Sequence, residues 1–143
     1  MEYKGAINNG AIEKIFPAKD KYLSELLDFI TEELRKADAP QKTLMQISIA
    51  VEEIFVNVAH YAYPDRTGNV KLEILFKANA VQLRFKDHGI PFNPLTKENP
   101  DITLSAEERD IGGLGIFMVK KTMDAIVYQY KDGMNILTIE KNW

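Results

Sequence analysis

A carboxylate and an amide spaced E-x-x-x-N stand within the apolar segment 51–63, which reads V-E-E-I-F-V-N-V-A-H-Y-A-Y. Burying such groups without partners costs several kcal/mol. At about 100° per residue of helix, Glu53 and Asn57 lie roughly 40° apart, whereas Glu52 points roughly 140° away from Asn57. Glu53 and Asn57 can therefore act on one ligand together, although this spacing alone is also typical of a surface ion pair beside a locally bonded amide.

A second candidate is the turn Asp87-His88-Gly89, which follows a strand-like stretch. Asp87 continues the apolar alternation of 81–87, so its carboxylate is expected on the buried side, where it needs a strong donor. The exocyclic amine of adenine would supply that donor, and Gly89 would let a planar base pack beside the backbone. The alternative is a simple Asx turn that ends the strand.

The third candidate is the glycine cluster Gly112-Gly113-Leu114-Gly115, which leads into an apolar helical segment. Backbone N–H groups at the start of a helix, together with its dipole, favour an anion such as phosphate. The cluster is also compatible with a flexible linker. Arg109 precedes the glycines and can contact a phosphate, or it can be a solvated arginine among acidic neighbours.

Two helices are expected to precede the strands. The first spans about 19–37, and the second begins at Pro40 and runs to about Ala62. The apolar stripe expected on the second helix comprises Leu44, Ile47, Val51, Ile54, Phe55 and Val58. Glu53 and Asn57 border this stripe, at the edge where a helix meets a cleft.

Strands are expected at Ala11–Pro17, which fits an edge strand, and at Asn69–Lys77 and 81–87, which form an antiparallel hairpin. The glycine cluster starts a third helix, and strands at 125–131 and 134–141 close the chain as another hairpin. The pattern predicts an α+β fold: a two-layer sandwich with helices on one face of a mixed, mostly antiparallel sheet.

The segment 91–111 contains three prolines and is too long for an ordinary connection in a compact domain. We interpret it as a mobile functional loop, a candidate lid over a ligand. The whole chain of 143 residues suits one domain, 1–143.

Composition narrows the function classes. The net charge of −3 argues against broad binding to nucleic acid, so a protein or a small ligand is the expected partner. The chain has no cysteine, which excludes disulfides and thiolate sites. No segment has the length and apolarity of a signal peptide or membrane span, which predicts a soluble, cytoplasmic protein.

In order, the three motifs resemble the N, G1 and G2 boxes of the GHKL ATP-binding superfamily. The stretches V-E-E-I-F-V-N, D-H-G-I-P-F-N-P and G-G-L-G-I-F-M-V look like the bacterial anti-sigma factor and serine-protein kinase family, over nearly all of 10–141. The resemblance implies a Bergerat-type sandwich that binds ATP and Mg²⁺ and phosphorylates a serine of a STAS-type anti-anti-sigma protein. It also implies a sigma factor as a second partner and a homodimer.

The resemblance also implies residue roles. Glu53 would be the general base for the serine hydroxyl, and Asn57 would bind magnesium. Asp87 would bind the adenine amino group and Gly89 would flank the base. The expected phosphate contacts are Arg109 and the backbone amides of Gly112, Gly113, Leu114 and Gly115.

The sequence departs from the family at two positions. Many relatives carry a histidine four residues after the asparagine, where this chain has Tyr61 and places His60 one position earlier. Where relatives often have a threonine early in the last strand, this chain has Asn135 or Ile136. One alternative therefore stays open: a nucleotide-sensing module that binds a partner without phosphoryl transfer. An ATPase fragment of the histidine-kinase type is disfavoured, because we expect no dimerisation helix with a phospho-accepting histidine before the domain.

Overall fold

The computed structural model of the chain describes residues 6–7, 10–96 and 111–143, with side chains placed in 10–96 and 115–143. The strands are β1 (Ala6–Ile7), β2 (Ala11–Pro17), β3 (Asn69–Lys77), β4 (Ala80–Asp87), β5 (Ala125–Lys131) and β6 (Met134–Asn142). The α-helices are α1 (Leu23–Lys36), α2 (Gln41–Asn57) and α3 (Ile111–Thr122). Short helical turns are η1 (Asp20–Tyr22), η2 (Val58–Ala62) and η3 (Pro94–Thr96).

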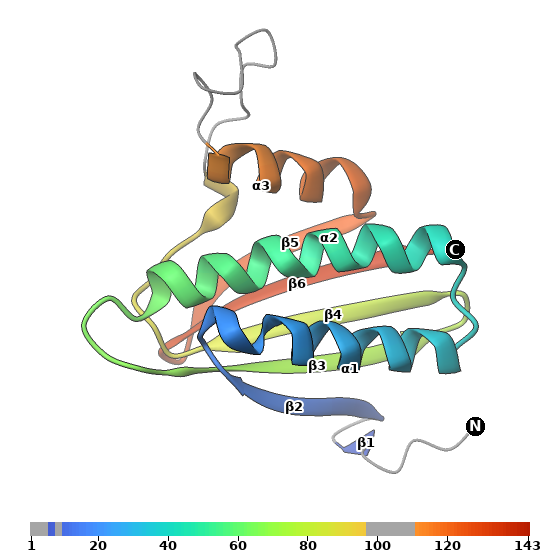
Figure 1. Cartoon of the computed structure of the whole chain (residues 1–143), viewed down its shortest axis with the longest axis horizontal. Coiled ribbons are helices and arrows are strands. Elements are labelled where there is room, and N and C mark those ends of the chain that lie inside the picture. Colours follow the sequence, from blue (N-terminus) through green and yellow to red (C-terminus); the bar gives the residue numbers. More distant parts are fainter. Residues whose placement is uncertain (1–5, 8–9, 97–110) are drawn as a thin grey trace, which may run out of the picture.

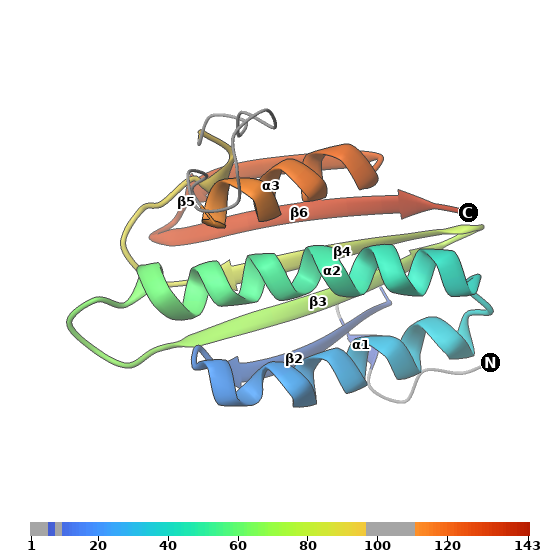
Figure 2. The same ribbon diagram turned by 45° about the horizontal axis from the view of Figure 1, so that its top comes forward.

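The strands form one sheet in the order β1-β2-β3-β4-β6-β5, and the three helices lie on one of its faces (Figures 1 and 2). This arrangement confirms the predicted α+β sandwich. The expectation of a mixed sheet is wrong for the described strands, because each of their ladders is antiparallel. The reason is strand order: β4 and β5 run the same way, but β6 lies between them and is antiparallel to both.

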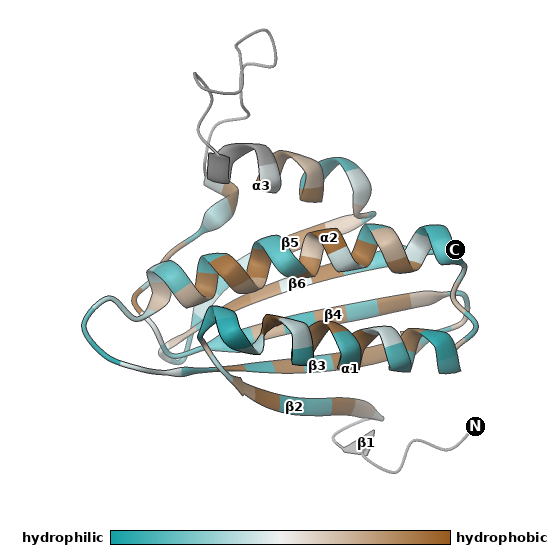
Figure 3. Cartoon of the chain, viewed as in Figure 1, coloured by the Kyte–Doolittle hydropathy of each residue, from teal (hydrophilic) through white to brown (hydrophobic). Residues whose placement is uncertain are grey.

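The core forms where alternate residues of the sheet meet the inner faces of the helices. Alternate side chains are buried from Val70 to Ile74 of β3 and from Val81 to Asp87 of β4, as the alternation predicts. The largest fully buried side chains include Phe16, Leu26, Ile30, Ile47, Ile54, Phe55, Leu72, Leu83 and Phe85. Figure 3 shows brown, apolar positions recurring along the helices and strands that enclose this layer.

Three local features of the structure differ from the predicted elements or add detail to them. The edge strand β2 is bordered at its start by the two-residue β1, which pairs Ala6 with Ile12. The first helix begins as the tight turn η1 before α1. The β5–β6 hairpin turns at Asp132 and Gly133, both with positive φ (55° and 76°), as its Asp-Gly sequence favours.

The second helix does not stay α-helical to Ala62. It is α-helical to Asn57 and continues as the π-helical turn η2. A π-turn is wider than an α-helical turn, with i→i+5 hydrogen bonds, and such turns are frequent at functional sites. Here η2 carries the chain from Asn57 to the loop that leads into β3. Among the described helices, none combines the length and apolarity that crossing a bilayer requires.

Candidate active site

Glu53 and Asn57 lie on the same side of α2, as their spacing predicts. The Asn57 Nδ2 donates a hydrogen bond of 3.0 Å to the Glu53 Oε2. Asn57 is buried and Glu53 is half-buried, whereas Glu52 is exposed. Because this bond uses the nitrogen of Asn57, its carbonyl oxygen is the atom suited to bind a hard cation.

The start of α3 packs directly against Glu53. A Cβ at Gly115 would lie 1.8 Å from the Glu53 Oε1, so only glycine permits this approach. The glycine cluster stands at the start of a helix, as predicted, because α3 begins at Ile111. The backbones of Gly112, Gly113 and Leu114 therefore lie in the first turn, where helical N–H groups have no partner within the helix.

Asp87 ends β4 as a buried carboxylate with only 4% of its surface exposed. Its Oδ1 accepts hydrogen bonds of 2.9 Å from the Gly89 N–H and from the Asn135 Nδ2. Burial raises the pKa of this carboxyl, and the bonds from Asn135 and Gly89 and the charge of His88 lower it in part. Both of these bonds end at Oδ1, which leaves Oδ2 as the acceptor for a ligand.

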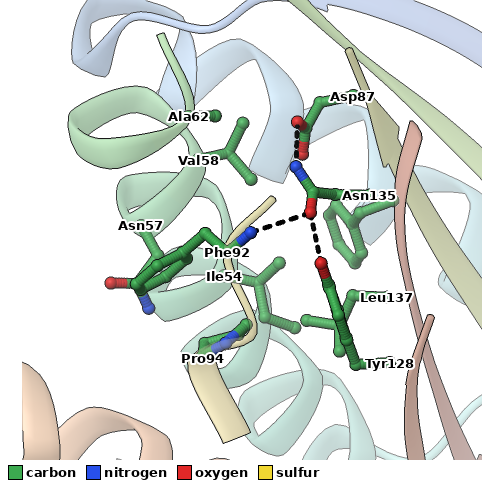
Figure 4. Close-up of a pocket in the computed structure, with 11 residues that line it drawn as sticks. Ile54, Asn57, Val58, Ala62, Asp87, Phe92, Pro94, Tyr128, Asn135 and Leu137 are labelled. Atoms are coloured by element: carbon green, nitrogen blue, oxygen red, sulfur yellow. Dashed lines mark hydrogen bonds between the residues drawn. The ribbon is translucent and has the colours of Figure 1, made fainter. Parts of the chain in front are cut away.

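Asn135 holds Asp87 and the following segment together. Its Nδ2 also donates to the Ile90 carbonyl (2.8 Å), and its Oδ1 accepts from the Phe92 N–H (3.0 Å) and from the Tyr128 hydroxyl (Figure 4). The β4–β6 register places Asn135 opposite Asp87. Of Asn135 and Ile136, it is therefore Asn135 that lies beside Asp87. Sequence reasoning missed Tyr128, whose only signal was its place in an alternating strand.

Gly89 packs against the end of η2. A Cβ at Gly89 would lie 2.3 Å from the Ala62 carbonyl oxygen, and the Ile90 N–H donates to that same oxygen at 2.8 Å. The absence of a side chain at Gly89 is therefore required by a neighbouring helix end. Any contact with a planar base would come in addition to this packing.

Asn57 and Asp87 line one cavity, although they come from α2 and β4. The cavity is lined by Ile54, Asn57, Val58, Ala62, Phe85, Asp87, Phe92, Pro94, Tyr128, Asn135 and Leu137 (Figure 4). Its volume of about 30 Å³ has room for water but not for a base. We therefore expect entry of a base to move Phe92 and Pro94, the lining residues on the segment after β4.

Part of the candidate lid 91–111 lies outside the described residues. The structure describes it to Thr96, including η3, and again at Ile111. Arg109 lies outside the described residues. Within the described part of the chain, no group of three or more His, Cys, Asp or Glu side chains could hold a metal. A magnesium ion held by one amide oxygen and by phosphates requires no such group.

His60 and Tyr61, at the departure near the N box, have different surroundings. His60 Nε2 lies 2.7 Å from Asp20 Oδ2, so this exposed pair connects η2 with η1. Tyr61 instead turns its ring toward Phe92, with ring centroids 5.5 Å apart and an interplanar angle of 31°. Tyr61 therefore contacts the segment that crosses the cavity.

Known proteins resemble this chain in sequence and in fold. The histidine kinase-like ATPase domain family matches residues 16–141. Serine-protein kinase RsbW of Listeria monocytogenes is 26% identical over 126 residues, covering 85% of this chain and 80% of the relative. Serine/threonine-protein kinase BtrW of Bordetella bronchiseptica is 26% identical over 94 residues, covering 65% of this chain and 66% of the relative.

Among solved structures, the histidine kinase AdeS of Acinetobacter baumannii matches with a TM-score of 0.51 at 14% identity. The match covers 91% of this chain and 66% of the other, so this chain spans just under two thirds of the histidine kinase. At that identity the likeness supports the fold alone. The chain belongs to the histidine kinase-like ATPase domain family.

Proposed function

We propose that this chain is an ATP-dependent protein serine kinase and anti-sigma regulatory factor whose substrate is a STAS-type anti-anti-sigma protein. The observation that carries the proposal is that Asn57 and Asp87, from separate elements, line one cavity, with Glu53 bonded to Asn57. The names of the kinase relatives RsbW and BtrW support the reaction class. A sigma factor as a second partner and a homodimer belong to the same proposal.

The polar groups around the cavity suit the base and the phosphates of a nucleotide. Asp87 presents a carboxylate oxygen that can accept from the adenine amino group, and the N-terminal turn of α3 favours phosphates. Magnesium, when bound, neutralises phosphate charge, and the Asn57 oxygen is the protein ligand we assign to it. Arg109 remains a proposed phosphate contact, and 91–111 remains a proposed lid on the single domain 1–143.

The reaction we assign to the site is an in-line transfer. Glu53 accepts the proton of the incoming serine hydroxyl while the serine oxygen bonds to the γ-phosphorus and the bond to the β-phosphate oxygen breaks, which releases ADP. The hydrogen bond from Asn57 holds the Glu53 carboxylate in one orientation. Positioning and charge stabilisation account for most of the catalysis in such transfers, so few residues suffice.

The test compares two neighbouring glutamates. Glu53→Gln should lower transfer from ATP to a panel of purified STAS-domain proteins by about a hundredfold or more, because the general base is lost. Binding of a fluorescent ATP analogue should persist. Glu52→Gln, at an exposed position of the same helix, is the matched control and should keep full activity. Loss of both binding and transfer in Glu53→Gln would contradict the assignment of Glu53 as the base.

A second function, nucleotide sensing without transfer, is favoured by the small cavity. A base must displace Phe92 and Pro94, so binding would rearrange a surface segment that a partner protein can detect. Tyr61, packed on Phe92, replaces the histidine of many relatives. Nucleotide binding by the parent protein with no phosphoserine on any member of the STAS panel would favour this function over the kinase.

A further inference from the structure

We propose that Tyr63 is a positioning residue that fixes the Asp87–Gly89 turn to the end of the helix carrying Glu53 and Asn57. The inference rests on the proposed nucleotide site and adds a residue to it. Tyr63 follows η2 directly and lies outside the cavity lining. It acts through the backbone of the turn and does not touch the ligand.

The Tyr63 hydroxyl bonds to both chain segments at the open end of the β3–β4 hairpin. It accepts a hydrogen bond of 2.9 Å from the His88 N–H and donates one of 2.6 Å to the Asn69 carbonyl. His88 follows Asp87 at the end of β4, and Asn69 opens β3. The phenol group thus sets where these two strand ends lie relative to the end of η2.

The loop between η2 and β3 is shaped around the Tyr63 ring. A Cβ at Gly68 would lie 2.1 Å from the Tyr63 Cε1, so the loop backbone passes against the ring. Arg66 covers the ring with its guanidinium carbon 5.5 Å from the centroid, and its Nη2 donates to the His88 carbonyl at 2.7 Å. Both polar backbone groups of His88 therefore bond to side chains of this loop.

Three consecutive backbone N–H groups hold the Asp87–Gly89 turn in place. The His88 N–H donates to Tyr63, the Gly89 N–H to the Asp87 carboxylate, and the Ile90 N–H to the Ala62 carbonyl. Two of these three bonds end at residues 62–63, where η2 ends. Since Asn57 lies just before η2, the link holds the base-binding and magnesium-binding candidates in a fixed arrangement.

The link predicts a specific kinetic effect. The turn presents Asp87 to the nucleotide in the ground state and in the transition state alike, so loosening it removes uniform binding. Such a change raises KM and leaves kcat almost unaltered. A general loss of folding would instead lower the amount of active protein, which would reduce the apparent kcat.

The experiment uses Tyr63→Phe, which keeps the ring against Gly68 and Arg66 but removes the hydroxyl. Because both hydrogen bonds of the hydroxyl are lost, we expect KM for ATP and Kd for a fluorescent ATP analogue to rise about tenfold, with kcat unchanged. Amide exchange at His88, followed by NMR, should accelerate, while Leu83 within β4 keeps its rate. Tyr130→Phe, at an exposed tyrosine of β5, is the matched control.

Gly68→Ala is the second variant, because its methyl group pushes the ring while keeping the hydroxyl; it should reproduce the rise in KM. Faster exchange at His88 with unchanged nucleotide affinity would overturn the proposal and leave Tyr63 a stabilising residue only. A fall in kcat as large as the rise in KM would also overturn the proposal. If the parent protein fails to bind ATP, the proposed function fails, while exchange at His88 still reports on the link itself.

Discussion

Burial raises the pKa of Asp87 above its ordinary value of 3.8, and the bonds from Asn135 and Gly89 offset this only in part. The folded protein therefore binds this proton more tightly than the unfolded chain does. Stability consequently falls as the pH rises from about 3.8 through the raised pKa, because ionisation is then penalised only in the folded state. At neutral pH the ionised Asp87 carboxylate therefore lowers the free energy of unfolding, as expected of a group that is retained for ligand binding.

Asp87→Asn should separate these two effects. An amide oxygen still accepts from Asn135 and Gly89, while an NH₂ group replaces the oxygen offered to the adenine amine. We expect ATP binding to weaken about ten- to a hundredfold. The thermal midpoint at pH 7 should equal or exceed that of the parent, and this advantage should shrink toward pH 3.8, as the parent takes up its proton. A variant that is less stable than the parent at pH 7 would contradict this account.

Predictions for single residues were correct where the periodicity of a strand or helix decides on which face a side chain lies. Alternation predicted the buried side of β4 for Asp87, and helical spacing predicted that Glu53 and Asn57 share one face while Glu52 points away from Asn57. They left Asn135 and Ile136 open, because only the pairing of β4 with β6 selects between them. Strand pairing is a long-range property that a single segment does not carry.

At the scale of elements, the ends of helices were harder to predict than their cores. The apolar pattern of 40–62 fits a continuous helix, and a π-turn such as η2 leaves that pattern almost unaltered. The sequence likewise did not predict that Gly89 packs on Ala62 or that Gly115 packs on Glu53. Glycine indicates that something lies close, but the neighbour is supplied by another element.

The contact between α3 and α2 leads to a prediction for Gly115→Ala. The new methyl group would fall 1.8 Å from the Glu53 Oε1, and the flexible glutamate should rotate away. Alanine favours a helix over glycine by about 1 kcal/mol, so the thermal midpoint should hold. Transfer should fall about as far as in Glu53→Gln, measured as the initial rate. Lys121→Ala, at an exposed position of α3, is the control, and full activity in Gly115→Ala would refute the steric argument.

At the scale of the molecule, period-two alternation and turn residues were enough to locate the longer strands to within about a residue of their ends. The strand β1 was missed because two residues carry no pattern. The sheet was expected to be mixed because sequence does not reveal that β6 lies between β4 and β5. Strand location is thus a local property, and strand order is a global one.

Strand order also predicts how the sheet opens. β4 is bonded on both sides, by β3 and β6, whereas among the described strands β5 has only β6 as a neighbour. Hydrogen exchange followed by mass spectrometry should therefore show a β4 peptide exchanging much more slowly than a β5 peptide. The measurement needs no ligand. Equal exchange of the two peptides would be inconsistent with β5 at the edge.

The bond from the Phe92 N–H to Asn135 has a consequence for timing. Asn135 bonds to Asp87 and to the segment that crosses the cavity at once, so we expect that moving Phe92 aside for a nucleotide breaks the bond from the Phe92 N–H to Asn135. Association of the proposed nucleotide would then depend on how often Phe92 and Pro94 move aside, and not on diffusion alone.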